Sequence, residues 1–327
     1  MKKFSFLSAF LALSVLSLLA AGPNPKQVSK QANWVAHLEF QDILTSEIGS
    51  FMMKEARKDP AFNQKMNGMM AVFGLNLEKM GSATAYGSGK KDEGVIITKG
   101  GINTKQLEGF ASLNEEAVVK SKGDKKTYSF KKGAFSSLGP DSIIIASDAE
   151  MLNHGLDVID GKSQSQKKMA VASYLNNLIE KPMAIMSVHV PKVLEIQGES
   201  IPAPQAAVLK KADLVGFALG EAGTSMRMAM AMRASDEKTA EHLENVLRGA
   251  WSLLSLGVEI TSETDSKEIG MDIDREYLKL FEKANAAISR EKRNVGLTID
   301  LETALLLEKI TEEIQKRNSK RQKNESD

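Results

Sequence analysis

Hydrophobic and polar residues alternate over residues 34–40, and one face of this segment carries Trp34, Ala36, Leu38 and Phe40. A period of two is typical of a strand with one buried face. Over residues 41–58 the apolar positions recur at helical spacing instead, and Pro60 ends the predicted helix. A second apolar helix is expected over residues 62–73, because Gly74 follows it.

Short apolar segments separated by turn residues continue the first half of the chain. The predicted strands are residues 82–88, 93–98, 117–122, 127–131 and 141–147. The first two and the next two flank short polar turns, which indicates two hairpins. The fifth is almost wholly apolar, which is typical of a central strand. Helices are predicted after Asn103, which can cap a helix, and over residues 148–159.

The second half of the chain shows the same kinds of segment in the same order. The predicted elements are a strand over residues 184–190, a short helix over 205–212, a hairpin of 214–221 and 224–234, and a final hairpin of 258–262 and 268–274. Between the hairpins lies a long amphipathic helix, which Ser235 is expected to cap and Gly257 to end. A further helix is expected to begin near Arg275.

This repeated order of strand, helix, hairpin, helix and hairpin predicts an internal duplication. We therefore expect an α+β fold of two related, mostly antiparallel sheet-and-helix halves, followed by a C-terminal helix and a disordered basic tail. The expected divisions are a signal peptide over residues 1–21, a first half over 22–165, a second half over 166–290, a helical segment over 291–314 and a tail over 315–327.

The first residues have the order of a secretory signal peptide. Lys2 and Lys3 precede an uncharged run over residues 4–21, and small residues close that run before Pro23. Cleavage is expected after Ala21, which predicts a periplasmic or secreted protein. The alternative is an uncleaved anchor, although the run is short for a membrane span. No later segment has the length of a membrane span.

Composition narrows the possible chemistry. The chain of 327 residues contains no cysteine, which excludes thiol nucleophiles, cysteine-ligated metals, disulfides and lipid attachment through cysteine. Its 43 basic and 42 acidic residues nearly balance, so no overall field favours binding to nucleic acid. With 42% hydrophobic residues, the chain can form a sizeable core.

Residues 93–165 contain a series of cap, turn and core positions, namely Gly100, Lys105, Leu107, Ser147, Asp148 and the run Leu-Asp-Val-Ile-Asp-Gly-Lys-Ser over residues 156–163. In this series the chain resembles a group of exported bacterial proteins of unknown function. The hairpin of residues 214–221 and 224–234 and the helical segment over residues 236–243 are similar to the second half of the same proteins. The similarity covers most of residues 34–280. It implies a duplicated α+β architecture, and it implies no activity.

Two histidines are the first candidates for chemistry. His37 and His189 occupy matching places in the strands that open the two halves, and Glu39 lies close to His37. If the duplication brought these side chains together, they could bind a metal or transfer protons. The alternative is that both are ordinary surface or hydrogen-bonded strand histidines, and this alternative is favoured because no third ligand is indicated.

Methionines give a second candidate, because one predicted strand presents four of them on a single face. These residues are Met226, Met228, Met230 and Met232. Thioethers are soft ligands that suit Cu(I). The alternative is packing, and it is favoured, since methionine fills irregular core spaces and a strand with one apolar face must bury it.

The sequence favours an exported, non-catalytic binding or structural protein of the cell envelope. We assign no catalytic residue, cofactor or metal, and the expected partner is an unidentified envelope or extracellular protein or polymer. The alternative is a hydrolase, or a copper-handling protein, whose site is assembled only in three dimensions. The sequence leaves open the ligand, the oligomeric state, and the choice between periplasm and exterior.

Overall fold

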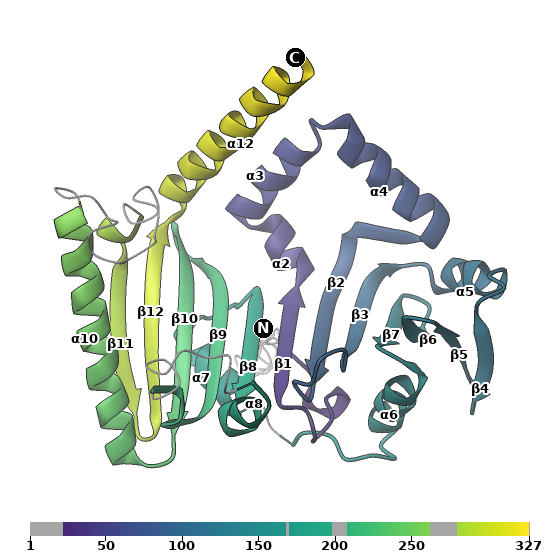
Figure 1. The fold of residues 1–327 in the computed structure, drawn as a ribbon, viewed down its shortest axis with the longest axis horizontal. Coiled ribbons are helices and arrows are strands. Elements are labelled where there is room, and N and C mark those ends of the chain that lie inside the picture. The colour runs from purple at the N-terminus through teal and green to yellow at the C-terminus, as the bar shows by residue number, and fades with distance from the viewer. Residues whose placement is uncertain (1–21, 168–169, 198–207, 262–279, 327) are drawn as a thin grey trace, which may run out of the picture.

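The computed structural model describes residues 22–167, 170–197, 208–261 and 280–326, and it is built on one twelve-stranded antiparallel sheet (Figure 1). The first-half strands are β1 (Trp34–Glu39), β2 (Leu75–Gly87), β3 (Val95–Ile102), β4 (Val118–Lys122), β5 (Lys125–Phe130), β6 (Gly133–Gly139) and β7 (Ser142–Ala146). The second-half strands are β8 (Ala184–His189), β9 (Ala212–Ala222), β10 (Ser225–Ala234), β11 (Asn285–Glu291) and β12 (Asn294–Glu302).

Helices occupy most connections between these strands. The helices up to α7 are η2 (Pro25–Gln27), α2 (Phe40–Thr45), α3 (Glu47–Ala56), α4 (Pro60–Phe73), α5 (Thr104–Ser112), α6 (Ala149–Ile159) and α7 (Ala170–Leu178). The later helices are α8 (Val190–Gln197), α10 (Glu237–Thr261) and α12 (Thr303–Ser326). Among the described residues, no helix is both long enough and apolar enough to cross a bilayer.

The strand order reveals the two related halves. Along the sheet the order is β11-β12-β10-β9-β8-β1-β2-β3-β7-β6-β5-β4. Read outwards from the centre, β1-β2-β3-β7-β6 matches β8-β9-β10-β12-β11, and each half places helices after its first, third and fourth strand of that series. The α+β fold with an internal duplication is therefore confirmed. The two halves share a continuous sheet through the antiparallel β1–β8 pair.

One face of the sheet is covered by α6 and α7. Leu152 and Leu156 of α6 are fully buried, as is Leu175 of α7, and all three belong to one core cluster that spans both halves. The close approach of α7 depends on Gly216 in β9, because a Cβ atom there would lie only 2.2 Å from Val171 Cγ1. The continuous cluster shows that the halves share one hydrophobic core.

The opposite face is covered only at its two ends. Helix α5 packs over β5 and β6, and α8 and α10 pack over β9, β10 and β12. Between these ends, large apolar side chains are 36–48% exposed, namely Leu38, Ile96, Ile145, Met186, Phe217 and Leu219. The sheet therefore has one face covered by α6 and α7 and one face that is open at its centre.

Several predicted elements need correction. Residues 133–139 form β6, which was not among the predicted strands. Val190, the last residue of the predicted strand over 184–190, begins α8 because Pro191 fits the first turn of a helix. Residues 258–261 end α10 and form no strand. The final hairpin is β11–β12. The predicted strand over 268–274, the predicted helix start near Arg275 and residues 205–207 of the predicted helix over 205–212 lie outside the described residues. Ala212, the last residue of that predicted helix, begins β9 instead.

Helix α10 is capped by Asp236 and not by Ser235. The Asp236 carboxylate accepts a hydrogen bond of 2.7 Å from the backbone N–H of Thr239, and this bond is the main cause of its lowered pKa. The hydroxyl of Ser235 donates to the same carboxylate at 3.0 Å. The prediction was therefore wrong by one residue, because either side chain can cap a helix.

The predicted disordered tail is also wrong for residues 315–326, which continue α12. Lys, Arg, Gln and Glu dominate this segment, and all four favour helix. Ion pairs one turn apart add support, with Lys309 Nζ 2.9 Å from Glu312 Oε2 and Lys316 Nζ 3.4 Å from Glu313 Oε1. Residues 315–319 are exposed, so this part of the helix is solvated.

Candidate functional site

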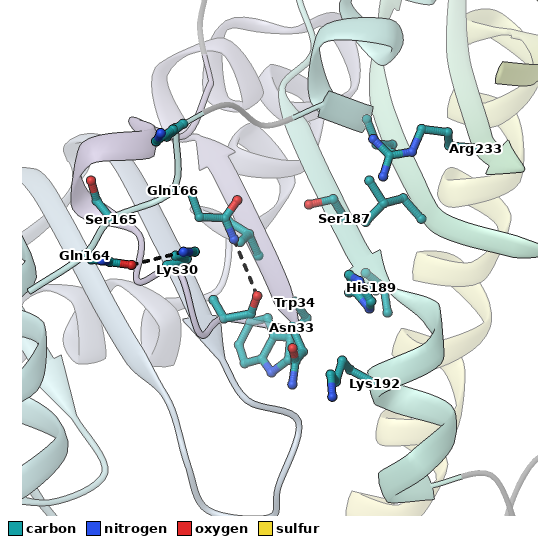
Figure 2. Close-up of a pocket in the computed structure, with 16 residues that line it drawn as sticks. Lys30, Asn33, Trp34, Gln164, Ser165, Gln166, Ser187, His189, Lys192 and Arg233 are labelled. Atoms are coloured by element: carbon teal, nitrogen blue, oxygen red, sulfur yellow. Dashed lines mark hydrogen bonds between the residues drawn. The ribbon is translucent and has the colours of Figure 1, made fainter. Parts of the chain in front are cut away.

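A pocket of about 870 Å³ opens at one end of the β1–β8 junction (Figure 2). Its floor is the helix-covered face of the sheet where β1 begins, β8 ends, β9 begins and β10 ends. The side chains that line it with polar groups are Lys30, Asn33, Gln164, Ser165, Gln166, Lys167, Ser187, His189, Lys192 and Arg233. This volume lies in the range of small-molecule binding sites.

The charged groups around this pocket all have one sign. Lys30, Lys167, Lys192 and Arg233 line it, and none of the described residues that line it is acidic. Figure 2 shows Lys192 and Arg233 on one side and Lys30 on the other. Of the four cations, Lys192 has a carboxylate partner, Glu195 at 3.3 Å, and that pair is exposed. Exposed pairs are weak, so the pocket keeps a positive potential.

Two buried nitrogen atoms in this pocket have no hydrogen-bond partner. They are Nε of Arg233 and Nδ1 of His189. Arg233 also makes no ion pair with any described residue. An unpaired buried donor is costly, and native structures contain few of them. These atoms therefore mark a place where the folded protein leaves hydrogen-bonding nitrogens unused.

The strand register explains why the His189 ring has an unpaired nitrogen. In the ladder, His189 stands opposite Leu214 of β9, and its backbone N–H donates to the carbonyl of Asn33 at 2.7 Å. Leu214 has no polar side-chain atom, and the Asn33 amide donates to Ser88 O at 2.7 Å. Arg233 stands opposite Leu214 on its other side, in β10. Leu214 thus lies between the two unpaired nitrogens and can form a hydrogen bond with neither.

The loop wall of the pocket is held by hydrogen bonds. The Lys30 ammonium donates to Gln164 Oε1 at 3.0 Å, and the backbone N–H of Lys30 donates to Gln164 O at 3.0 Å. Gln166 donates through its backbone to Val28 O at 2.8 Å and through its amide to Ala32 O at 3.4 Å. Because both segments are fixed in this way, the polar lining is preorganised.

The structure keeps the predicted histidine pair apart. His37 stands opposite Ile185, whereas His189 lies beside Asn33, so four residue steps of roughly 3.3 Å separate them along the ladder. Both histidines lie near the ends of equivalent strands, and antiparallel pairing places such ends far apart. Glu39 does contact His37, with Oε1 2.8 Å from Nε2.

His37 has the environment of a hydrogen-bonded core residue. Its ring is 4% exposed, Nδ1 lies 2.8 Å from Thr84 Oγ1, and Nε2 lies 2.8 Å from Glu39. Both ring nitrogens therefore have partners within the protein. Among the described residues, no group of three or more histidine or acidic side chains is arranged to hold a metal ion.

The four methionines share one face of β10, as the alternation predicts. Met226 and Met232 are 7% and 3% exposed, and Met232 packs with Leu243 of α10. Met228 and Met230 are half-buried and stand opposite Leu219 and Phe217 of β9. Packing thus accounts for at least Met232, and the proposed copper site remains a prediction.

Sequence reasoning singled out His189 but missed the cations around it. Lys30 and Lys192 lie in loop and helix segments that only the fold brings together. The sequence pattern around Arg233 could have identified it, because Arg233 shares with Ala229 and Ala231 the face of β10 that α7 covers. An arginine among small residues on a covered face is a departure from the usual pattern.

Comparisons with known proteins leave the function open. No protein-family model and no curated protein matches the chain. Among solved structures, crystal form IV of TP0453 gives a TM-score of 0.48 at 8% identity, covering 89% of this chain and 98% of that one. Crystal forms III and I give 0.45 at 7% and 0.43 at 8% identity, covering 88% and 90% of this chain and 98% of theirs.

Proposed function

We propose that this chain is an exported, non-catalytic protein of the cell envelope that binds an anionic ligand in the pocket at the β1–β8 junction. The observation that carries the proposal is a pair of unpartnered buried nitrogens, the donor Arg233 Nε and the ring atom His189 Nδ1, in a pocket without a described acidic side chain. A bound anion would accept a hydrogen bond from Arg233, and also from His189 in the tautomer that carries a proton on Nδ1. Charge-assisted hydrogen bonds of this kind are the stronger ones in proteins.

The composition of the lining supports a specific type of ligand. Amides of Asn33, Gln164 and Gln166 and the hydroxyls of Ser165 and Ser187 surround the cations. Such groups both donate and accept hydrogen bonds, so they suit a ligand that has hydroxyl or carboxyl oxygens besides its charge. The volume of about 870 Å³ has room for more than an inorganic ion.

Binding accounts for the pocket better than catalysis does. Ser187 and His189 lie two residues apart on one strand face, yet no hydrogen bond joins their side chains, and no described carboxylate lines the pocket to orient the ring. Nucleophilic catalysis usually needs a nucleophile, a base and a group that orients the base. The arrangement supports recognition of a charge and offers no such set.

Calorimetric titration of the purified chain at low ionic strength tests the proposal. Citrate and pyrophosphate serve as anionic probes, and sucrose serves as the neutral one. We expect saturable one-to-one binding of at least one anion and none of sucrose. Replacing Arg233→Gln should weaken binding at least about tenfold, because one charge-assisted bond contributes about 1.5–3 kcal/mol.

The matched control is Arg317→Gln, which removes the same charge from exposed α12. It should leave the affinity unchanged. If neither anion binds, or if both variants weaken binding equally, the pocket is not the anion site. Cell fractionation and N-terminal sequencing test export separately: an envelope location with Gly22 as first residue is expected, and a cytoplasmic protein with residues 1–21 intact would contradict it.

A further inference from the structure

A second cavity, of about 420 Å³, lies on the open face of the sheet beneath α5. Its wall is formed by strands β2, β3, β5, β6 and β7 together with Leu107 of α5, and almost every lining side chain is apolar. The lining residues that bear on binding are Thr98, Lys132, Phe135, Ile143 and Ile145. The cavity shares no residue with the anion pocket.

Thr98 is the one buried polar side chain in this lining, and it has no partner. It is 7% exposed, and its Oγ1 atom makes no hydrogen bond. The ladder explains this, since Thr98 stands between Ala83 of β2 and Ile143 of β7, and neither side chain can bond to it. A buried hydroxyl without a partner costs free energy.

Three other buried threonines of the fold have partners for their hydroxyl groups. The Thr84 hydroxyl lies 2.8 Å from His37 Nδ1, and the Thr127 hydroxyl donates to Lys120 O at 3.3 Å. The Thr104 hydroxyl donates to Gly139 O at 3.0 Å. The unpaired hydroxyl of Thr98 therefore points to a group that the chain itself does not supply.

The mouth of the cavity carries a positive charge. Lys132 and Ile145 line this cavity and also a broader hollow of about 1290 Å³ on the same face of the sheet, so they mark the opening between the two. Lys132 is exposed and makes no ion pair with a described residue. Its ammonium group can therefore hold an anion at the mouth while an apolar body fills the interior.

We infer that this cavity binds a small amphipathic organic acid whose apolar body also carries one uncharged polar group, a hydroxyl or a carbonyl. The carboxylate would face Lys132 and solvent, the body would contact Ile143 and the ring of Phe135, and the uncharged polar group would bond the hydroxyl of Thr98. A cavity of about 420 Å³ is suited to such a molecule. This site is independent of the anion pocket, because it uses other residues on the other face.

Calorimetric titration with three probes tests the inference. Decanoate, 10-hydroxydecanoate and decan-1-ol differ in one polar group at a time. We expect 10-hydroxydecanoate to bind the purified chain more tightly than decanoate, and decan-1-ol to bind most weakly. Lys132→Gln should weaken binding of both acids about fivefold or more and leave decan-1-ol unchanged. Thr98→Val should abolish the preference for the hydroxylated acid.

Two matched controls separate the site from general effects. Lys131→Gln removes a neighbouring charge that lies outside the cavity, and Thr127→Val removes a buried hydroxyl elsewhere in the sheet. Neither should change the affinities. A third variant, Ile145→Trp, should obstruct the mouth and reduce binding of all three probes. The inference fails if no probe saturates, if Lys131→Gln acts like Lys132→Gln, or if Thr98→Val keeps the preference.

Discussion

His37 and His189 lie near the ends of the two central strands, on the same face of the sheet, yet one is satisfied and the other is not. His37 bonds to Thr84 and Glu39 through its two ring nitrogens, each at 2.8 Å. His189 faces Leu214, and its Nδ1 atom has no partner. The second half of the fold thus leaves a ring nitrogen of its histidine unpaired, whereas both ring nitrogens of the first-half histidine have partners.

This difference predicts that replacement by leucine lowers the free energy of unfolding at His37 and leaves it nearly unchanged at His189. His37→Leu leaves the buried hydroxyl of Thr84 without its partner, so it should lower the free energy of unfolding by about 1–3 kcal/mol. His189→Leu removes an unpaired group and should change it by less than about 0.5 kcal/mol. Urea denaturation at pH 7 measures both values. Equal losses in the two variants would show that His189 has a structural partner.

The two arginines of β10 provide a second matched pair. Arg227 binds Asp300 through two bonds, of 2.6 and 2.7 Å, and donates to Leu178 O at 3.2 Å. Arg227→Met should therefore lower the free energy of unfolding by about 1–2 kcal/mol. Arg233→Met should leave stability unchanged or raise it slightly, because no described residue pairs with Arg233. Urea denaturation measures the free energy of unfolding of both variants. A large loss of stability in Arg233→Met would contradict the proposed binding role.

Tyr86 predicts a loss of stability at alkaline pH. Burial raises the pKa of its hydroxyl to about 12 from 10.0, and this hydroxyl has no hydrogen-bond partner. Between these values the unfolded chain releases the proton and the folded chain keeps it, so stability falls as pH rises. A shift of this size corresponds to roughly 2–3 kcal/mol at pH 12.

Tyr86→Phe removes this effect. The variant should match or exceed the wild-type protein in stability at pH 7, and its advantage should grow between pH 10 and pH 12. Tyr174→Phe is the control, because the Tyr174 hydroxyl lies 3.4 Å from Ser289 Oγ and its loss should lower stability at pH 7. Thermal unfolding monitored across this pH range measures both, and a constant difference between Tyr86→Phe and wild type would contradict the shift.

The close contact of α7 with the sheet predicts a strong effect of one methyl group. In Gly216→Ala the new Cβ would lie 2.2 Å from Val171 Cγ1 and 2.9 Å from Leu175 Cδ1. Overpacking of this kind costs about 1–3 kcal/mol. Gly249→Ala in α10 meets no atom within 4 Å and should raise stability by up to about 1 kcal/mol. Calorimetry measures the thermal unfolding midpoints of both variants. An unchanged midpoint in Gly216→Ala would show that α7 can move away from the sheet.

Local patterns in the sequence predicted most of the fold. The alternation of Trp34, Ala36 and Leu38 and of the β10 methionines marked strands, and repetition of the order of elements indicated the duplication. Errors occurred where two residue types satisfy the same rule, as with Ser235 and Asp236 at the start of α10. They also occurred where a weakly apolar segment is stabilised by its neighbours, as with β6.

The candidate sites were largely beyond the reach of the sequence. Lys30 and Arg233 are 203 positions apart in the chain and meet only because β1 and β8 pair at the centre of the sheet. Thr98 resembles any strand threonine until the register places Ala83 and Ile143 beside it. Unpaired donors are a property of neighbours in space, and one-dimensional patterns do not contain that information.

The antiparallel pairing of β1 with β8 has a consequence for symmetry. Two identical subunits related by a two-fold axis would join equivalent strands in this way. Such a dimer must carry the same site twice, because every substitution appears in both copies. In a single polypeptide the two copies can differ in sequence. One copy can then keep a fully hydrogen-bonded histidine that stabilises the fold, while the histidine of the other copy takes part in ligand binding.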